Sequence, residues 1–216
     1  MGAHMVKLSS ELMSLFKITN DDVSIYLENN AGFYGLHESR ISSLLFSQLT
    51  DAIKNRKFSS FAVTDLMQAI DGVNHRHVVE NRFKHPPLQG FYKSHFITPA
   101  FIMKNLINEW GLNFENSKKF DTLCKKIISE EEINPSKHGW QDRFAHEFVI
   151  EGYKDRANKN NLTGEWLIYS KYKGMNIFLC LASHSSNTQD DFLIYKTMKH
   201  FCAKEFPFLF DLNHLI

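Results

Sequence analysis

The stretch that decides the fold runs from Glu165 to His184, EWLIYSKYKGMNIFLCLASH. It holds two largely apolar runs, Glu165–Tyr172 and Met175–His184, joined by Lys173-Gly174, and a two-residue loop ending in glycine is typical of a β-hairpin. The second run is almost wholly apolar, so we expect a strand that is central in its sheet and covered on both faces. The hairpin therefore predicts a small antiparallel sheet.

Helical patterns lie on both sides of this hairpin. Apolar residues at helical spacing predict helices over 39–54 and 99–110, and the polar segment 186–191 opens a last helix. Helices before and after a short sheet indicate the α+β class. We expect a mainly helical N-terminal half, a small antiparallel sheet including the hairpin 165–184, and a C-terminal helix.

Domain organisation follows from length and local composition. Residues 1–5, MGAHM, resemble a vector-derived scar, and we exclude them from the fold. With 216 residues the chain is long enough for a single core, so we expect one α+β domain over 6–216. The acidic run Glu130–Glu132 and the following Asn134-Pro135 mark the place for a subdivision, near 130–136.

Charge disfavours one class of function. The chain carries 25 basic and 24 acidic residues, a formal charge of +1. A protein that coats duplex DNA without sequence preference is expected to have a larger basic excess. A local basic site for single-stranded RNA, or a surface for a protein partner, remains compatible with this balance.

The compartment is predicted from two absences. No apolar run approaches the 18 residues that a membrane helix needs, so we expect no membrane partner. Three cysteines, without CxxC spacing, are typical of reduced thiols, and we expect a cytoplasmic protein. The oligomeric state is not determined by the sequence.

The candidate chemistry lies in His75–Ile97, HRHVVENRFKHPPLQGFYKSHFI, which holds four of the eleven histidines. Histidine titrates near neutral pH, and aromatic and basic residues alternate with it here. If the residues after Gly90 form a strand, Lys93 and His95 share one face, because side chains alternate with period two. His85 precedes Pro86-Pro87, which make a rigid approach to that strand.

The hairpin predicts a second pair. With a two-residue loop, Tyr172 pairs with Met175 and Glu165 lies opposite Ala182, which makes Glu165 and His184 diagonal neighbours on one face. A carboxylate beside a histidine fixes the tautomer of the ring. The pairing depends on register, since a slip of one residue separates the two side chains.

These residues suit metal-independent cleavage of RNA or another phosphodiester, by a hydrolase that needs no cofactor. His95 would be the general base or acid, with His85 or His184 as its complement, while Lys93 stabilises charge on phosphorus and Glu165 orients His184. A toxin or effector nuclease has this character. The expected substrate contacts are aromatic stacking and one cation. They are Arg82, Tyr92, Phe96 and Trp166.

Two alternatives stay open. The first is a non-enzymatic interaction protein, such as an immunity protein, adaptor or inhibitor, in which the aromatic and basic residues of 83–96 form an interface hot spot. The second is a metal-dependent hydrolase that uses His75, His77, His85 and His95, although no HEXXH or related signature is present.

Overall fold

The computed structural model divides the chain into two compact units. The first comprises Met1–Phe96 and Glu165–Ile216, and the second, Ile97–Gly164, is inserted between two strands of the first. The prediction of one domain stays a prediction, and the segment near 130–136 lies inside the second unit. The structure describes residues 8–29, 31–96, 99–113, 115–158, 165–183 and 188–211.

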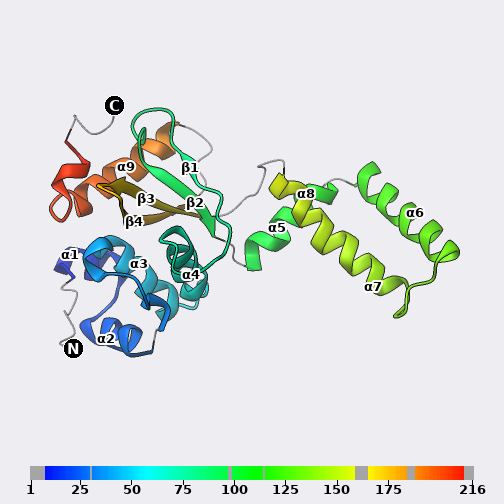
Figure 1. Ribbon diagram of the computed structural model, residues 1–216, viewed down its shortest axis with the longest axis horizontal. Coiled ribbons are helices and arrows are strands. Elements are labelled where there is room, and N and C mark those ends of the chain that lie inside the picture. The colour runs from blue at the N-terminus through cyan, green and yellow to red at the C-terminus, as the bar shows by residue number, and fades with distance from the viewer. Residues whose placement is uncertain are drawn as a thin grey trace. The chain divides into compact units, whose positions relative to one another are not determined.

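The first unit is built on a four-stranded antiparallel sheet (Figure 1). Its order is β1-β2-β3-β4, and the α+β class is confirmed. Helices dominate the N-terminal half, and the hairpin turns at Lys173-Gly174 as expected. The strands are β1 (Asn81–Arg82), β2 (Tyr92–Phe96), β3 (Glu165–Tyr172) and β4 (Met175–Ser183).

Strand β4 lies at the end of this order, so the prediction of a central strand is wrong. Its burial has another cause, because the segment that leads into α3 (Ser43–Lys54) covers its outer edge. Ser42 N–H donates to the Phe178 carbonyl at 3.0 Å, and the Gln48 side-chain amide both donates to and accepts from the backbone of Leu181. An edge strand covered in this way offers few free backbone groups for aggregation.

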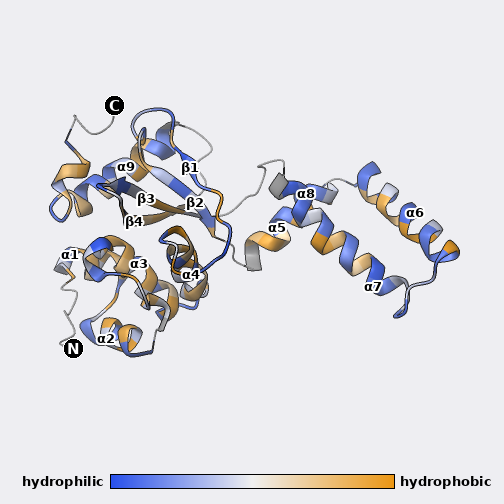
Figure 2. Cartoon of the chain, in the orientation of Figure 1, coloured by the Kyte–Doolittle hydropathy of each residue, from blue (hydrophilic) through white to orange (hydrophobic). Residues whose placement is uncertain are grey.

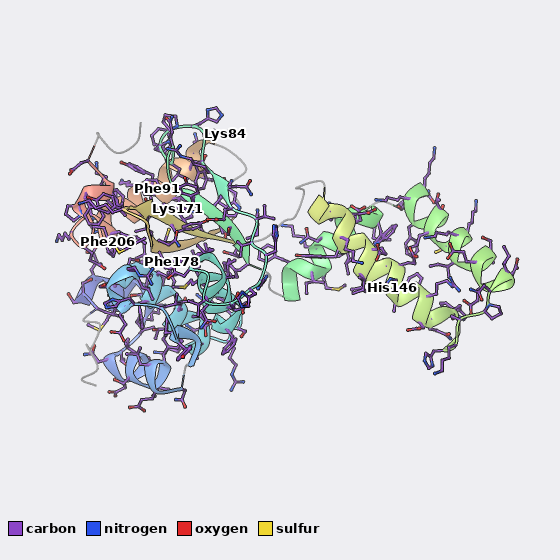
Figure 3. The ribbon with its side chains drawn as sticks, viewed as in Figure 1. Lys84, Phe91, His146, Lys171, Phe178 and Phe206 are labelled. Carbon is purple, nitrogen blue, oxygen red and sulfur yellow. The ribbon has the colours of Figure 1, made fainter. Side chains whose placement is uncertain are left out.

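Helices cover both faces of the sheet, so each face has its own apolar cluster. Helices α3 and α4 (Ser60–Ile70) pack on one face around Phe96, Leu167 and Phe178, and α9 (Thr188–Cys202) packs on the other around Trp166 and Ile168. Phe178 and Phe91, from opposite clusters, are labelled in Figure 3. The remaining elements of this unit are α1 (Ser10–Phe16), α2 (Asn20–Asn29), η1 (Ala31–Phe33), η2 (Glu38–Arg40) and η4 (Pro207–Leu209).

In Figure 2, parts of the cartoon of α3, β3 and β4 have the colour of hydrophobic residues. Burial of such side chains on both faces explains why the hairpin reads as two continuous apolar runs. None of the helices in the described residues is both long and apolar enough to cross a membrane.

The second unit is helical and contains a π-helix, in which a side chain from another helix bonds to a backbone carbonyl. The indole N–H of Trp110 donates to the Phe148 carbonyl at 2.8 Å, which takes the place of an α-helical donor. A Cβ on Gly152 would lie 2.6 Å from Trp110 Nε1, so only glycine allows this approach. The elements are α5 (Pro99–Trp110), α6 (Lys118–Ile133), α7 (Trp140–Ala145), η3 (His146–Glu151, the π-helix) and α8 (Gly152–Asn158).

Helix α6 continues through the acidic run that was expected to mark a subdivision. Glu130 and Glu131 accept hydrogen bonds from Arg143 at 3.1 and 3.0 Å, and Asn134 caps the helix. Because these carboxylates have a cationic partner, the run extends the helix.

Candidate functional site

Strand alternation places Lys93 and His95 on one face of β2, as predicted, and both reach the same indole. His95 lies directly opposite Trp166 in the β2–β3 register. The indole N–H of Trp166 donates to His95 Nε2 at 3.2 Å, and Lys93 Nζ lies 3.5 Å from the centroid of a Trp166 ring. Trp166 therefore brings a cation and an imidazole together.

The environment of Lys93 is unusual for a lysine. Its Nζ also lies 4.5 Å from the centroid of Phe83, so two aromatic rings replace much of its hydration. This partial burial lowers the pKa of Lys93, and the nearby charge of Asp191 opposes the shift. In the described part of the chain no carboxylate lies within ion-pairing distance of Lys93. Its charge is thus held close to the rings by cation–π attraction.

The hydrogen bond from Trp166 also defines the state of His95. An indole N–H can only donate, so Nε2 of His95 is the acceptor and the proton of the neutral ring is on Nδ1. Nδ1 itself is buried. A substrate that takes or gives a proton at Nε2 must replace the Trp166 hydrogen bond.

Glu165 does not join this cluster. A bulge between Ile168 and Tyr169 shifts the register, so Glu165 lies opposite Ser183 and the predicted pairing with Ala182 is wrong. Glu165 precedes Trp166 on β3 and therefore points to the other face of the sheet from His95. Burial raises the pKa of its carboxyl, and a 3.3 Å hydrogen bond from Ser183 Oγ offsets part of the effect.

Three of the other candidate histidines, His75, His77 and His85, lie in exposed segments outside β2. His85 is exposed in the loop between β1 and β2, whose residue Lys84 is labelled in Figure 3. His75 and His77 are exposed in the segment before β1. His184 lies outside the described residues. Of the predicted catalytic side chains, the structure brings Lys93 and His95 together.

The predicted substrate contacts are placed differently from the expectation. Phe96 is 1% exposed and Trp166 is 2% exposed, so neither ring is available to stack on a base, and that part of the prediction is wrong. Tyr92 stacks on Tyr169 on the face opposite to Lys93. Arg82, the register partner of Tyr92, is exposed on β1.

The face that carries Tyr92 has a second polar cluster, which the sequence analysis missed. Tyr169 Oη donates to Glu80, and Lys171 Nζ forms an ion pair with the same carboxylate at 2.9 Å. Partial burial acts to raise the pKa of Glu80, but these two donors outweigh it and the pKa is lowered. Only cross-strand register brings Glu80 to Lys171, so no local pattern in the sequence could have indicated the contact.

Asp191 is the other residue that the sequence did not single out. It lies in the first turn of α9, where acidic residues stabilise the helix dipole, and this local role hides its proximity to Lys93. The signal in the sequence that could have indicated this proximity is the position of Asp191 shortly after the end of the hairpin.

A pocket lies on the face of the sheet that carries Trp166, between β4, α3 and α9. Its volume is about 390 Å³, within the range of small-ligand sites. The walls are largely apolar, with Asp190 and Ser183 among the polar residues, and Ala182 in its wall is the register partner of Trp166. The pocket therefore borders the Trp166 cluster.

The structure also bears on the two alternative functions, the metal-dependent hydrolase and the interaction protein. Among the described residues, no group of three or more His, Cys, Asp or Glu side chains converges to hold a metal ion, and the metal-dependent hydrolase stays an untested alternative. Phe83, Phe91 and Phe96 are buried and Tyr92 is half-buried, and the interface hot spot predicted at 83–96 stays a prediction.

Comparison with known proteins adds no further indication. No family model, no curated protein and no solved structure matches this chain.

Proposed function

We propose that the first unit cleaves a phosphodiester bond, that of RNA, without a metal ion. The observation that carries the proposal is the convergence of Lys93 Nζ and His95 Nε2 on the indole of Trp166. An imidazole that transfers a proton, next to a cation that stabilises charge on phosphorus, is a minimal arrangement for such chemistry.

Each residue has a stated role. The neutral His95 accepts the proton of the attacking 2′-hydroxyl at Nε2 after the substrate displaces the Trp166 donor. Lys93 interacts more strongly with a phosphate than a fully hydrated lysine does, because the rings of Trp166 and Phe83 exclude part of its water. The pocket beside Ala182 is large enough for a base and supplies hydrogen-bonding groups.

We predict that a second histidine protonates the leaving oxygen. His85, exposed on the loop before β2, is one candidate and His184 is the other. The proposal also includes a role as a toxin or effector in the cytoplasm. The free thiols of Cys180 and Cys202, buried in one apolar cluster, are compatible with a reducing compartment.

The test uses the purified chain and a labelled single-stranded RNA, with and without EDTA. His95→Gln keeps a side-chain oxygen that accepts from Trp166 but cannot titrate, and we expect it to lower the cleavage rate by about 10²–10⁴-fold. Lys93→Met should lower the rate by about 10²-fold, in the range for losing one charge-stabilising group. The matched controls, His77→Gln and Lys173→Met, change exposed residues and should leave the rate unchanged.

Four results would contradict the proposal. EDTA-sensitive cleavage favours the metal alternative, and absence of cleavage on any RNA or DNA leaves the interaction protein ahead. A rate that is flat from about pH 5 to 8 excludes histidine acid–base chemistry, which gives a bell-shaped profile. An equal loss of cleavage rate in His95→Gln and His77→Gln would show that the loss does not depend on the Trp166 cluster.

A further inference from the structure

Helix α9 presents an apolar and basic face that no described element covers. Phe192 and Leu193 are 58% and 66% exposed, and Lys196, Lys199 and His200 are exposed as well. These positions follow the spacing i, i+1, i+4, i+7, i+8, which places them on one face of a helix. Met198 and Cys202 on the inner face are buried in the core.

This face forms one wall of a groove, and Pro87 forms part of the other. The groove has a volume of about 650 Å³ and runs along α9 from Phe192 to His200, roughly 12 Å at the rise of a helix. Pro87 belongs to the rigid His85-Pro86-Pro87 loop. The lining is Pro87, Phe192, Leu193, Tyr195, Lys196, Lys199 and His200.

The charged side chains that line the groove are all basic. Within the described residues, Lys196 and Lys199 have no carboxylate at ion-pairing distance, and Lys199 Nζ lies 5.9 Å from the centroid of Tyr195. His200 lies 2.8 Å from Glu11 and is the paired member of the set. The acidic residues of α9 lie elsewhere, since Asp190 lines the pocket against β4 and Asp191 interacts with Lys93.

We propose that this groove binds an acidic amphipathic helix of a protein partner. A helix with apolar residues at i, i+3, i+4 and i+7 would bury them against Phe192 and Leu193, and carboxylates beside that stripe would meet Lys196 and Lys199. Complementary charge fixes the orientation of the bound helix and raises its association rate. The proposal is independent of phosphodiester cleavage.

The observations favour this partner over two others. A second copy of the chain would bring no carboxylate from its own α9 face to Lys196 and Lys199. Phe192 and Tyr195 are aromatic surfaces on which single-stranded RNA could stack, but Leu193 and Pro87 fill the rest of the lining with aliphatic surface, which suits the apolar stripe of a helix better than bases. The apolar and basic character together match an acidic helix.

The test is fluorescence anisotropy with two labelled synthetic peptides of 18 residues, roughly five helical turns. Both carry leucine at the stated helical spacing, and one has glutamate and the other lysine at the remaining positions. We expect the full chain to bind the acidic peptide at least about tenfold more tightly than the basic one, a difference of about 1.4 kcal/mol.

Variants locate the binding and its charge dependence. Two double variants should each weaken binding of the acidic peptide at least about tenfold. They are Phe192→Ser/Leu193→Ser and Lys196→Glu/Lys199→Glu. The second should also reverse the preference, so that the basic peptide binds more tightly. Phe61→Ser on α4, where Phe61 is 59% exposed, and Lys118→Glu/Lys125→Glu on α6 are the matched controls and should change binding less than about twofold.

Several outcomes would overturn the proposal. They are equal binding of the two peptides, equal weakening by the control variants, and no change in peptide preference for Lys196→Glu/Lys199→Glu. Tighter binding to phosphatidylserine vesicles or to a single-stranded RNA, with the same variant dependence, would assign the groove to that ligand. Concentration-dependent self-association abolished by Phe192→Ser/Leu193→Ser would assign it to a second copy.

Discussion

Two lysines of the sheet lie over aromatic rings, and they differ in what else surrounds their charge. Lys171 lies 5.1 Å from the centroid of Tyr92 and forms a 2.9 Å ion pair with Glu80. Lys93 lies closer to its indole and, among the described residues, has no carboxylate at ion-pairing distance. Proximity to an aromatic ring therefore does not by itself distinguish the two lysines. The difference is the carboxylate of Glu80, which neutralises the charge of Lys171 and has no counterpart at ion-pairing distance of Lys93 among the described residues.

The largest expected effect comes from removing the ring beneath Lys93. Trp166→Ala should lower the free energy of unfolding by about 3–5 kcal/mol, since the indole is almost fully buried. Urea denaturation measures the loss. The control Trp140→Ala removes an exposed indole and should cost about 0.5 kcal/mol or less. Losses of equal size would show that Trp166 does not organise the Lys93 face.

A smaller effect is expected on the face of Lys171. Tyr169→Phe removes the hydroxyl that donates to Glu80 and should cost about 1–2 kcal/mol, below the upper range for bonds to charged groups because Glu80 is partly exposed. Tyr34→Phe, at an exposed ring, is the control.

The same variant has a pH signature. The pKa of Glu80 is lowered in the folded protein, so its contribution to stability is present above the ordinary value of 4.5 and is lost as pH falls through the lowered pKa. The difference between the wild type and Tyr169→Phe should therefore shrink in acid. A difference that is constant down to about pH 2 would contradict the assignment of the stabilisation to Glu80.

The smallest effects should have opposite signs for the two lysines. Lys171→Met breaks an exposed ion pair and should cost about 0.2–1 kcal/mol. Lys93→Met replaces a partly desolvated cation with an apolar chain that keeps the ring contacts, and should raise stability by up to about 1 kcal/mol at neutral pH. Equal destabilisation by both variants would remove the distinction between the two sites.

The pH dependence sharpens the assignment for Lys93. Its pKa is lowered in the folded protein, so between that value and the ordinary 10.5 the unfolded chain binds more protons and stability rises with pH. The advantage of Lys93→Met should thus decrease as pH approaches 10.5. Parallel stability curves for the variant and the wild type across this range would exclude a desolvated lysine.

Much of the local structure could be predicted from periodicity. The hairpin loop at Lys173-Gly174, the α+β class and the shared face of Lys93 and His95 depend on neighbouring residues, and they are confirmed. The pairing of Glu165 could not be predicted, because one extra residue opposite Ile168 and Tyr169 changes the register without changing the apolar pattern.

Local patterns in the sequence predicted the two hairpin strands and the alternation that puts Lys93 and His95 on one face, since these properties are set by adjacent side chains. Only the tertiary structure decided which segments meet. It placed Trp166 under Lys93 and His95, Glu80 beside Lys171, and Pro87 opposite the exposed face of α9. Such contacts depend on cross-strand register and on packing between elements far apart in the chain, which local patterns do not encode.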